Sequence, residues 1–242
     1  MSKPDIGVDV DDFRLPTKES LRKAADLAFR TVELATVAGD VAPSNLSSSG
    51  RRHLFRYVDG LGLRLAALVG DMPRLRLTDA HTVDERVERT CRILDLAADL
   101  NVPLVTASTG ALTHPETGEP SVEAVSALRR IGEYADLRGI AYALRPSYDS
   151  GERIVRVLDE LRCPSIRVCL DPAAMVMTGA NPLSRIEQFV EQVALLHARD
   201  STAGLAERTG HETRLGEGEV DLVGVLAVLD AAEYRGKGEF RP

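Results

Sequence analysis

Residues 125–171 read VSALRRIGEYADLRGIAYALRPSYDSGERIVRVLDELRCPSIRVCLD, and this stretch decides the fold. Apolar residues at helical spacing end at Gly139 and are followed at once by a short apolar run at 140–144. A second helical pattern at 154–161 then leads into a second run at 166–170. Because helices and strands that alternate in this way form a parallel sheet covered by helices, the stretch predicts successive β–α units.

The same alternation extends over the whole chain. Seven or eight β–α units, spaced roughly 25 to 40 residues apart, predict a (β/α)8 TIM barrel that forms a single domain over residues 1–242. An open doubly wound sheet would carry a glycine-rich turn after its first strand, whereas residues 9–14 contain no glycine. Strands are predicted at 6–10, 31–36, 63–69, 103–107, 140–144, 166–170, 194–197 and, more weakly, 239–240.

Local signals mark several helix ends. Residues 82–85, Thr-Val-Asp-Glu, have the form of a capping box, and Asp221 precedes an apolar helical pattern in the same way. Gly139 stands where a left-handed helix cap is expected. After the predicted helix at 221–233 only residues 234–242 remain, so the eighth β–α unit is expected to be short or incomplete.

Composition excludes several classes of protein. The chain of 242 residues is 44% hydrophobic and has 30 basic and 37 acidic residues, a net charge of −7 that disfavours binding to nucleic acid or to an anionic membrane. It has neither an apolar run of about 20 residues nor the pattern of a secretion signal. Cys91, Cys163 and Cys169 form no Cys-x-x-Cys pair. We therefore expect a cytoplasmic protein with reduced thiols.

Charged residues follow the apolar runs. In a (β/α)8 barrel the carboxyl ends of the strands carry the chemistry, and these positions hold Glu33, Arg145, Asp171 and His197, while the later loops add His211 and Arg214. A charge buried at the mouth of a barrel is unfavourable without a partner or a ligand. The side chains are therefore expected either to bind a ligand or to pair among themselves and hold the loops.

The last third of the chain carries the most specific pattern. Asp171-Pro172 is followed by His-x-x-Asp at 197–200 and by Gly-x-Gly-x-x-Asp at 216–221. With Glu33 at the second strand, this order resembles the sugar phosphate isomerase/epimerase family of xylose isomerase-like TIM barrels. The resemblance covers nearly the whole chain, and it implies an isomerase, an epimerase or a related lyase that acts on a sugar or cyclitol.

The resemblance also implies a divalent metal ion, but the chain departs from the family's ligand set. Members hold the ion with a Glu at strand five, an Asp at strand six, a His at strand seven and a Glu at strand eight. Asp171 and His197 match, but Arg145 occupies the strand-five position. At the last strand the glutamate would fall near Arg241, and Glu239 is in a different register.

The substitution at strand five predicts a site that works without a metal. A guanidinium and a divalent cation about 4 Å apart would repel by roughly 8 kcal/mol at an effective dielectric constant of 20. We therefore expect no cofactor, with Mn²⁺ or Mg²⁺ at Asp171 and His197 as the alternative. Arg145 is expected to take the place of the metal, to pair with Asp171 and to face an anionic group of the ligand.

Three functions remain open on the sequence. The first is an isomerase/epimerase-like protein that binds a small polyhydroxylated or anionic molecule. Its catalytic residues would be His197 and Asp171, its substrate-binding residues Arg145, Arg214, Glu33 and His211, and any turnover a metal-independent proton transfer. The second is a catalytically inactive barrel that serves as a binding or scaffolding subunit. The third is the ordinary metal-dependent enzyme, with Glu239 or Glu33 as a ligand. A homo-oligomer would be one way to cover the last strand.

Overall fold

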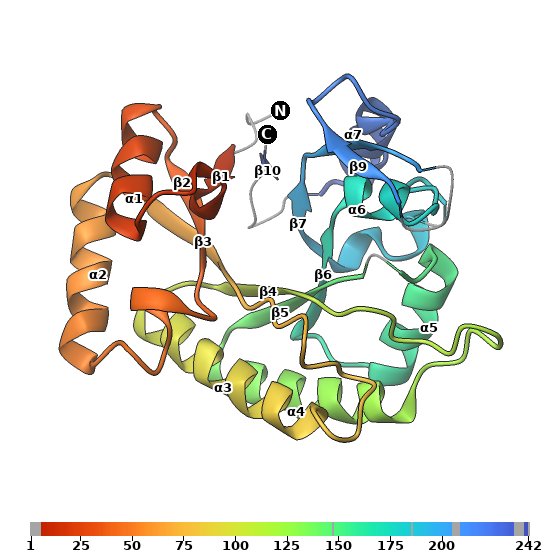
Figure 1. Cartoon of the computed structure of the whole chain (residues 1–242). Coiled ribbons are helices and arrows are strands. Elements are labelled where there is room, and N and C mark those ends of the chain that lie inside the picture. The colour runs from red at the N-terminus through yellow and green to blue at the C-terminus, as the bar shows by residue number, and fades with distance from the viewer. Residues whose placement is uncertain (1–5, 147, 185, 205–208, 235–239, 242) are drawn as a thin grey trace.

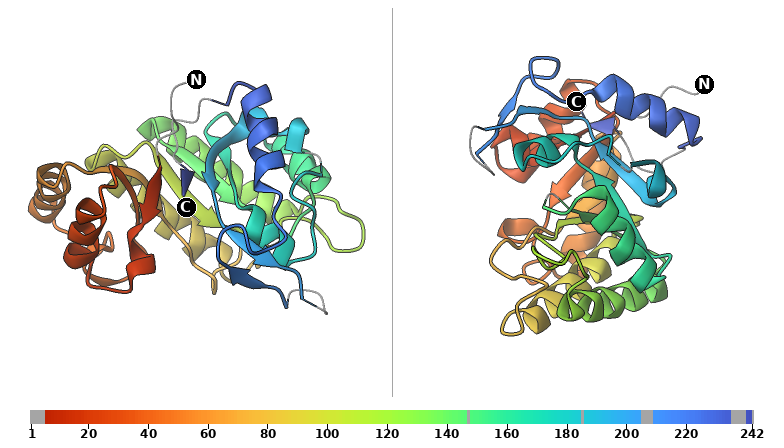
Figure 2. Two further views of the ribbon diagram at one scale, coloured as in Figure 1. Left: turned by 90° about the horizontal axis from the view of Figure 1, so that it is seen from above. Right: turned by 90° about the vertical axis from the view of Figure 1, so that its right-hand side faces the viewer.

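The computed structural model shows a strongly curled sheet of parallel strands with helices on its outer face (Figure 1). Views along two further directions show the same curled sheet with helices around its outer face (Figure 2). The structure describes residues 6–146, 148–184, 186–204, 209–234 and 240–241.

Eight strands form the sheet in the order β1-β2-β3-β4-β5-β6-β7-β10, and every neighbouring pair is parallel. Consecutive strands in the chain are therefore neighbours in the sheet, as in a barrel built from β–α units. The strands are β1 (Gly7–Asp9), β2 (Thr31–Ala35), β3 (Arg64–Val69), β4 (Leu104–Ser108), β5 (Ala141–Arg145), β6 (Ile166–Leu170), β7 (Val193–His197) and β10 (Phe240–Arg241).

The helices connect these strands, and an antiparallel hairpin follows β7. The hairpin consists of β8 (Asp200–Thr202) and β9 (His211–Thr213). Short 3-10 helices lie at η1 (Val10–Phe13), η2 (Gly39–Val41), η3 (Ile186–Gln188) and η4 (Val190–Gln192). The α-helices are α1 (Thr17–Asp26), α2 (Ser48–Gly60), α3 (Val83–Asp99), α4 (Val122–Arg138), α5 (Gly151–Leu161), α6 (Pro172–Met177) and α7 (Leu222–Ala231).

The eighth unit is short, as the sequence predicts. β10 contains two residues, which pair with Leu196 and His197 of β7. Within the part of the chain that the structure describes, no helix follows β10 and no ladder joins β10 to β1 at the other end of the sheet. The predicted fold class, a xylose isomerase-like (β/α)8 barrel with an incomplete last unit, is therefore confirmed.

The helix α4 illustrates how the sequence determines the packing. Leu128, Ile131 and Ala135 recur at helical spacing, and all three are completely buried against the sheet. Gly139 ends the helix with φ at 66°, the left-handed cap expected of it. Gly132 lets the helix approach its neighbours closely, because an added Cβ would meet Cys163 Sγ at 2.5 Å.

One predicted helix start has a different physical basis. Thr82 precedes α3, but its side chain makes no capping bond. Its hydroxyl instead accepts from Arg76 N at 3.2 Å and donates to Arg76 O, so it holds the loop before the helix rather than the first turn. The capping-box prediction is therefore wrong at this position. The cap at Asp221 is confirmed, because Oδ1 accepts from Gly224 N at 2.8 Å.

In the described part of the chain, no helix is long and apolar enough to cross a membrane.

Candidate active site

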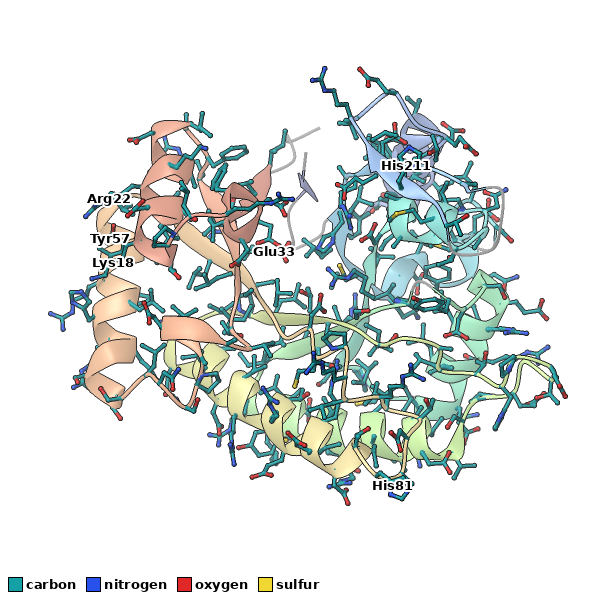
Figure 3. The ribbon with its side chains drawn as sticks, viewed as in Figure 1. Lys18, Arg22, Glu33, Tyr57, His81 and His211 are labelled. Carbon is teal, nitrogen blue, oxygen red and sulfur yellow. The ribbon has the colours of Figure 1, made fainter. Side chains whose placement is uncertain are left out.

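A buried histidine and a buried carboxylate meet inside the curled sheet. His197 ends β7 and Glu33 lies on β2, and neither residue is more than 2% exposed. His197 Nε2 lies 3.3 Å from Glu33 Oε1. The β2–β3 ladder shifts its register between Val32 and Glu33, an irregularity of the kind that re-aims side chains near active sites. The contact joins β2 to β7, which are not neighbours in the sheet, and Figure 3 shows Glu33 on the inner side of β2.

Asp171 lies on the other side of the imidazole. It follows β6 directly and caps α6, with Oδ1 accepting from Ala174 N at 3.0 Å. Its Oδ2 lies 3.7 Å from His197 Nδ1 and accepts from Arg199 Nη1 at 2.8 Å. Burial acts to raise the pKa of Asp171, but its interactions with His197 and the positive charge of Arg199 outweigh burial and hold that pKa well below its usual range. Asp171 is therefore an ionised carboxylate that faces the imidazole.

Arg145 reaches the same imidazole from β5, and its ion-pair partner differs from the one we expected. Its Nη1 lies 3.4 Å from His197 Nδ1, while its Nη2 pairs with Asp71 rather than with Asp171. Asp71 follows β3 and is held by Ser108 N, which donates to its Oδ1 at 2.5 Å. The reason for the difference is that Arg199 already occupies Asp171 Oδ2.

Arg199 connects this network to the hairpin β8–β9. Besides Asp171, its guanidinium pairs with Glu212 on β9 through both Nε and Nη2. The hydrogen bond to Glu212 and the charge of Asp171 raise the pKa of Arg199 above its ordinary value, against the opposing effect of burial. The hairpin is therefore anchored to the carboxylate that faces His197.

The other two predicted binding residues lie away from this network. His211 is exposed on β9, where its ring contacts Thr202 Oγ1 at 3.3 Å, and Figure 3 shows it well separated from Glu33. Arg214 is exposed in the loop after β9. Among the described residues, no hydrogen bond or ion pair joins either side chain to Arg145, Asp171 or the rest of the network.

The motif residue Asp200 has a structural role. Its carboxylate accepts backbone N–H groups from Ser201, Gly216, Gly218 and Val220, at 2.8 to 3.1 Å. Gly218 is required there because an added Cβ would clash with that carboxylate. The Gly-x-Gly-x-x-Asp motif thus forms a loop wrapped around the Asp of His-x-x-Asp, and the pattern in the sequence reflects loop geometry.

Two residues of the network were not identified from the sequence. Asp71 is separated from the apolar run at 63–69 by a single glycine, one residue farther from its strand than Asp171. Arg199 lies inside the His-x-x-Asp motif, where its position two residues after His197 was a usable signal. Both residues could have been predicted, because functional residues of a (β/α)8 barrel lie at the carboxyl ends of its strands.

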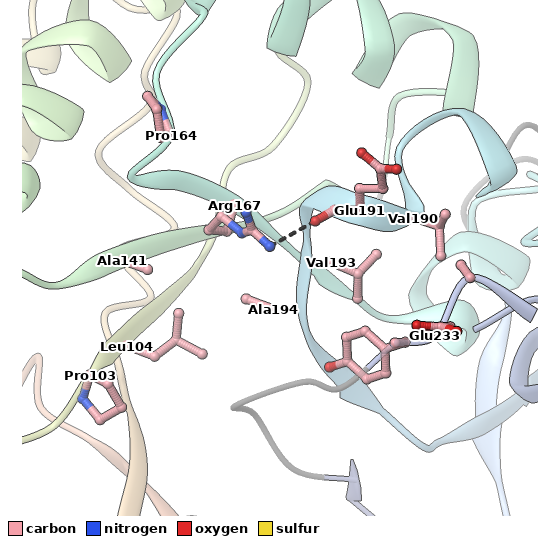
Figure 4. Close-up of a pocket in the computed structure, with 12 residues that line it drawn as sticks. Pro103, Leu104, Ala141, Pro164, Arg167, Val190, Glu191, Val193, Ala194 and Glu233 are labelled. Atoms are coloured by element: carbon pink, nitrogen blue, oxygen red, sulfur yellow. Dashed lines mark hydrogen bonds between the residues drawn. The ribbon is translucent and has the colours of Figure 1, made fainter. Parts of the chain in front are cut away.

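Cavities lie both at the carboxyl ends and at the amino ends of the strands. One of about 300 Å³ is bounded by the segments that follow β3 and β4, next to Asp71 and Ser108. A larger one, of about 570 Å³, is lined by residues at the starts of β4 to β7 and by Tyr234 (Figure 4). There Arg167 Nη2 donates to the carbonyl of Glu191 at 2.7 Å. The smaller cavity is the candidate ligand site, because it alone of these two adjoins the buried charged network.

Comparison with known proteins assigns the family. A model of the xylose isomerase-like TIM barrel matches residues 21–237, so the chain belongs to this family. No curated protein matches it.

Solved structures share the fold at low sequence identity. A xylose isomerase domain protein from Planctomyces limnophilus is 22% identical with a TM-score of 0.85, covering 100% of this chain and 92% of its own. A D-tagatose 3-epimerase-like protein is 18% identical with a TM-score of 0.77, covering 98% and 89%. A xylose isomerase-like TIM barrel protein from Mycobacterium smegmatis, in complex with magnesium, is 15% identical with a TM-score of 0.74, covering 99% and 89%.

The side chains around His197 do not fit the metal that this family implies. Among the described residues, no group of three or more His, Cys, Asp or Glu is placed to hold an ion. The guanidinium of Arg145 lies within 3.4 Å of His197 Nδ1, and that of Arg199 is bonded to Asp171 Oδ2. In the backbone register of β10, Arg241 pairs with His197, while Glu239 lies outside the described residues.

Proposed function

We propose that the chain is an isomerase/epimerase-like protein that binds a small polyhydroxylated or anionic molecule, with Arg145 in the place of a metal ion. The supporting observation is the position of this guanidinium, between Asp71 and His197 Nδ1. A guanidinium presents several fixed donors to oxygen atoms of a carbonyl, a carboxylate or an enediolate.

Side-chain exposure indicates which groups meet a ligand first. The exposed fraction is 1% for His197, 14% for Arg145 and 36% for Asp71. A ligand that approaches from solvent therefore meets Asp71 and Arg145 before it reaches the imidazole. We infer that Arg145 exchanges part of its contact with Asp71 for an oxygen of the ligand.

Any turnover is proposed to be a proton transfer next to a carbonyl group. A base removes the proton from the hydroxyl-bearing carbon beside the carbonyl. The electron pair of the C–H bond forms a C=C bond, and the π pair of the carbonyl moves onto its oxygen to give an enediolate. Return of the proton to the opposite face of the same carbon re-forms the carbonyl and epimerises the molecule. Return to the former carbonyl carbon isomerises it, provided that the hydroxyl proton passes to the other oxygen. His197 is the proposed acid and base: Asp171 orients the ring at Nδ1, and Nε2 exchanges its contact with Glu33 for the substrate proton, while Arg145 stabilises the enediolate oxygen.

A binding protein without turnover is the second candidate, and the burial of His197 favours it. An imidazole that is 1% exposed and flanked on both nitrogens accepts a substrate proton only after its neighbours move. In that case Asp71 and Arg145 bind the ligand and no chemistry follows.

Two measurements test the proposal. The first is the thermal shift of the protein, in the presence of a chelator, against ketoses, cyclitol ketones, sugar acids and sugar phosphates. We expect one class to raise the melting temperature of the wild type, Arg145→Gln to abolish the shift, and Arg138→Gln, an exposed change on α4, to keep it. A shift that survives Arg145→Gln would contradict the proposed site.

The second measurement is exchange of the ligand's C–H hydrogen with deuterated solvent, followed by proton NMR. Exchange that His197→Gln abolishes supports proton transfer, whereas binding without exchange supports the second candidate.

A further inference from the structure

The cavity beside Asp71 and Ser108 has a wall of unusual charge. It lies between the segments after β3 and β4, with Tyr148 from the loop after β5, and holds about 300 Å³. Its described lining includes two arginines, Arg76 and Arg86, and no aspartate or glutamate. In a protein with a net charge of −7, such a cavity is locally positive.

Arg86 is the more informative of the two arginines, because its charge is buried among neutral groups. It lies in the first turn of α3 and is 2% exposed. Its Nη1 donates to the carbonyl oxygens of Met72 and Leu75, and its Nη2 donates to the carbonyl oxygen of Ser108 and to the hydroxyl of Tyr142. Within the described part of the chain, Nε has no hydrogen-bond acceptor and no carboxylate lies within 4 Å of this guanidinium.

A buried cation without a counter-ion is costly, and proteins ordinarily pair it. By contrast, Arg145 and Arg199 in the network each have a carboxylate, Asp71 for Arg145 and Asp171 for Arg199. Arg86 differs from them in having only neutral partners, although it lines a cavity large enough for several non-hydrogen atoms. An anion in that cavity would supply the missing charge.

Arg76 adds a second positive group from the rim of the same cavity. It is exposed, so its side chain can turn toward a bound anion. Its charge contributes to the lowered pKa of Asp79, which the backbone N–H of His81 lowers more strongly, but Asp79 does not line the cavity.

We propose that this cavity binds an oxyanion, a phosphate or a carboxylate, with Arg86 as a fixed cation and Arg76 as a mobile one. Ser108 places this oxyanion next to the proposed catalytic network. Its carbonyl oxygen accepts from Arg86, and its N–H donates to Asp71, which pairs with Arg145. Resting on the proposed function, the inference names the substrate class: a polyhydroxylated molecule with an anionic group at one end, which lies beside Arg86 while its carbonyl end faces Arg145.

The first test uses inorganic phosphate alone. Calorimetric titration at constant ionic strength, with sodium chloride as the balancing salt, is expected to show one site in the wild type. Arg76→Gln should weaken its affinity about tenfold, since a charge-assisted hydrogen bond is lost. Arg74→Gln is the matched control, because Arg74 is exposed in the same loop but does not line the cavity, and it should leave the affinity unchanged. No phosphate binding, or equal binding by Arg76→Gln and the wild type, would overturn the proposal.

Arg86 itself needs a variant that keeps the fold. Arg86→Lys retains the positive charge but cannot make all four hydrogen bonds of the guanidinium. Its circular dichroism is therefore compared with that of the wild type to show whether it is folded. Where Arg86→Lys is folded, weaker phosphate binding supports the proposal and unchanged binding contradicts it. If Arg86→Lys is unfolded, the comparison of phosphate binding by Arg76→Gln and Arg74→Gln decides whether the proposal holds.

The second test separates the two oxyanions and the two proposals. A sugar phosphate that binds more tightly than phosphate identifies the phosphate class, and a sugar acid that binds more tightly than acetate identifies the carboxylate class. If Arg145→Gln loses the added affinity for the sugar derivative but still binds phosphate, both the proposed ligand site at Arg145 and the oxyanion site at Arg86 are supported. If neither ligand gains affinity over its bare anion, the proposed function fails and the oxyanion site stands.

Discussion

The Nη1 atom of Arg145 lies 3.4 Å from Nδ1 of His197. This is the position at the strand ends where the family resemblance implies a divalent metal ion in other members. The positive charge at this point is covalently attached and is fixed by Asp71. A guanidinium cannot leave or lose its charge at neutral pH, so the electrostatics of the site are permanent. A ligand that develops negative charge on an oxygen can use the guanidinium directly.

Replacing this guanidinium by a carboxylate should create a metal site. In Arg145→Glu, three carboxylates and one imidazole would share the space around His197, a donor set suited to a divalent ion. We expect this variant to bind Mn²⁺ at least about tenfold more tightly than the wild type, measured by electron paramagnetic resonance titration after chelator treatment. Arg138→Glu on the surface of α4 is the control. Tight stoichiometric Mn²⁺ in the wild type would contradict the argument.

The lowered pKa of Asp171 predicts how stability depends on pH. Because the folded-state pKa lies below that of the unfolded chain, acid protonates the unfolded state first. The stabilisation by Asp171 is therefore complete well above the ordinary aspartate pKa of about 4 and is lost as pH falls from there through the folded-state pKa. Asp171→Asn should cost about 1.5 to 3 kcal/mol at pH 7, since it removes a charge-assisted hydrogen bond from Arg199, which keeps its pair with Glu212, and the difference should shrink in acid.

Urea denaturation at several pH values measures this dependence. Asp84→Asn is the control, because Asp84 forms a surface ion pair with Arg130, which should contribute less than about 1 kcal/mol. A constant difference between wild type and Asp171→Asn from pH 7 to pH 3 would contradict the assignment.

The fold was predictable because it depends on a repeated pattern. The run at 65–69 is apolar on both faces, as strands covered by helices must be, and it forms the buried part of β3. The predicted strand at 166–170 has the same bounds as β6. The short eighth unit was predictable from the residues left after α7.

The sequence predicted which residues lie at the site, but not how they pair with one another. Strand ends identified Arg145, Asp171 and His197, but the pairing of Arg145 depends on which carboxylate is still available, and this is decided by Arg199 in three dimensions. Arg86 was beyond sequence reasoning, because it lies on a helix whose periodicity predicts only burial or exposure and says nothing of a missing counter-ion.

The carboxylate of Asp200 should control the loop that contains Gly216 and Gly218. Asp200→Ala removes the acceptor of both N–H groups and that of Val220. We expect these amides to exchange with deuterated solvent at least about tenfold faster, as charge-assisted hydrogen bonds are lost. Glu217→Gln, an exposed change in the same loop, should leave their exchange rates unchanged. Protection that persists without Asp200 would mean that other contacts hold the loop.

Two glycines in helices should respond to alanine in opposite directions. Gly132 of α4 faces Cys163 and Ile166, so the added methyl group of Gly132→Ala must displace a side chain or the helix, at an expected cost of about 1 to 3 kcal/mol. Gly60, the last residue of α2, has open space around its Cβ position and no positive φ. Gly60→Ala should therefore stabilise the protein by up to about 1 kcal/mol through helix propensity alone. Chemical denaturation of both variants measures the difference, and equal effects would show that α4 does not pack against the sheet as closely as the structure indicates.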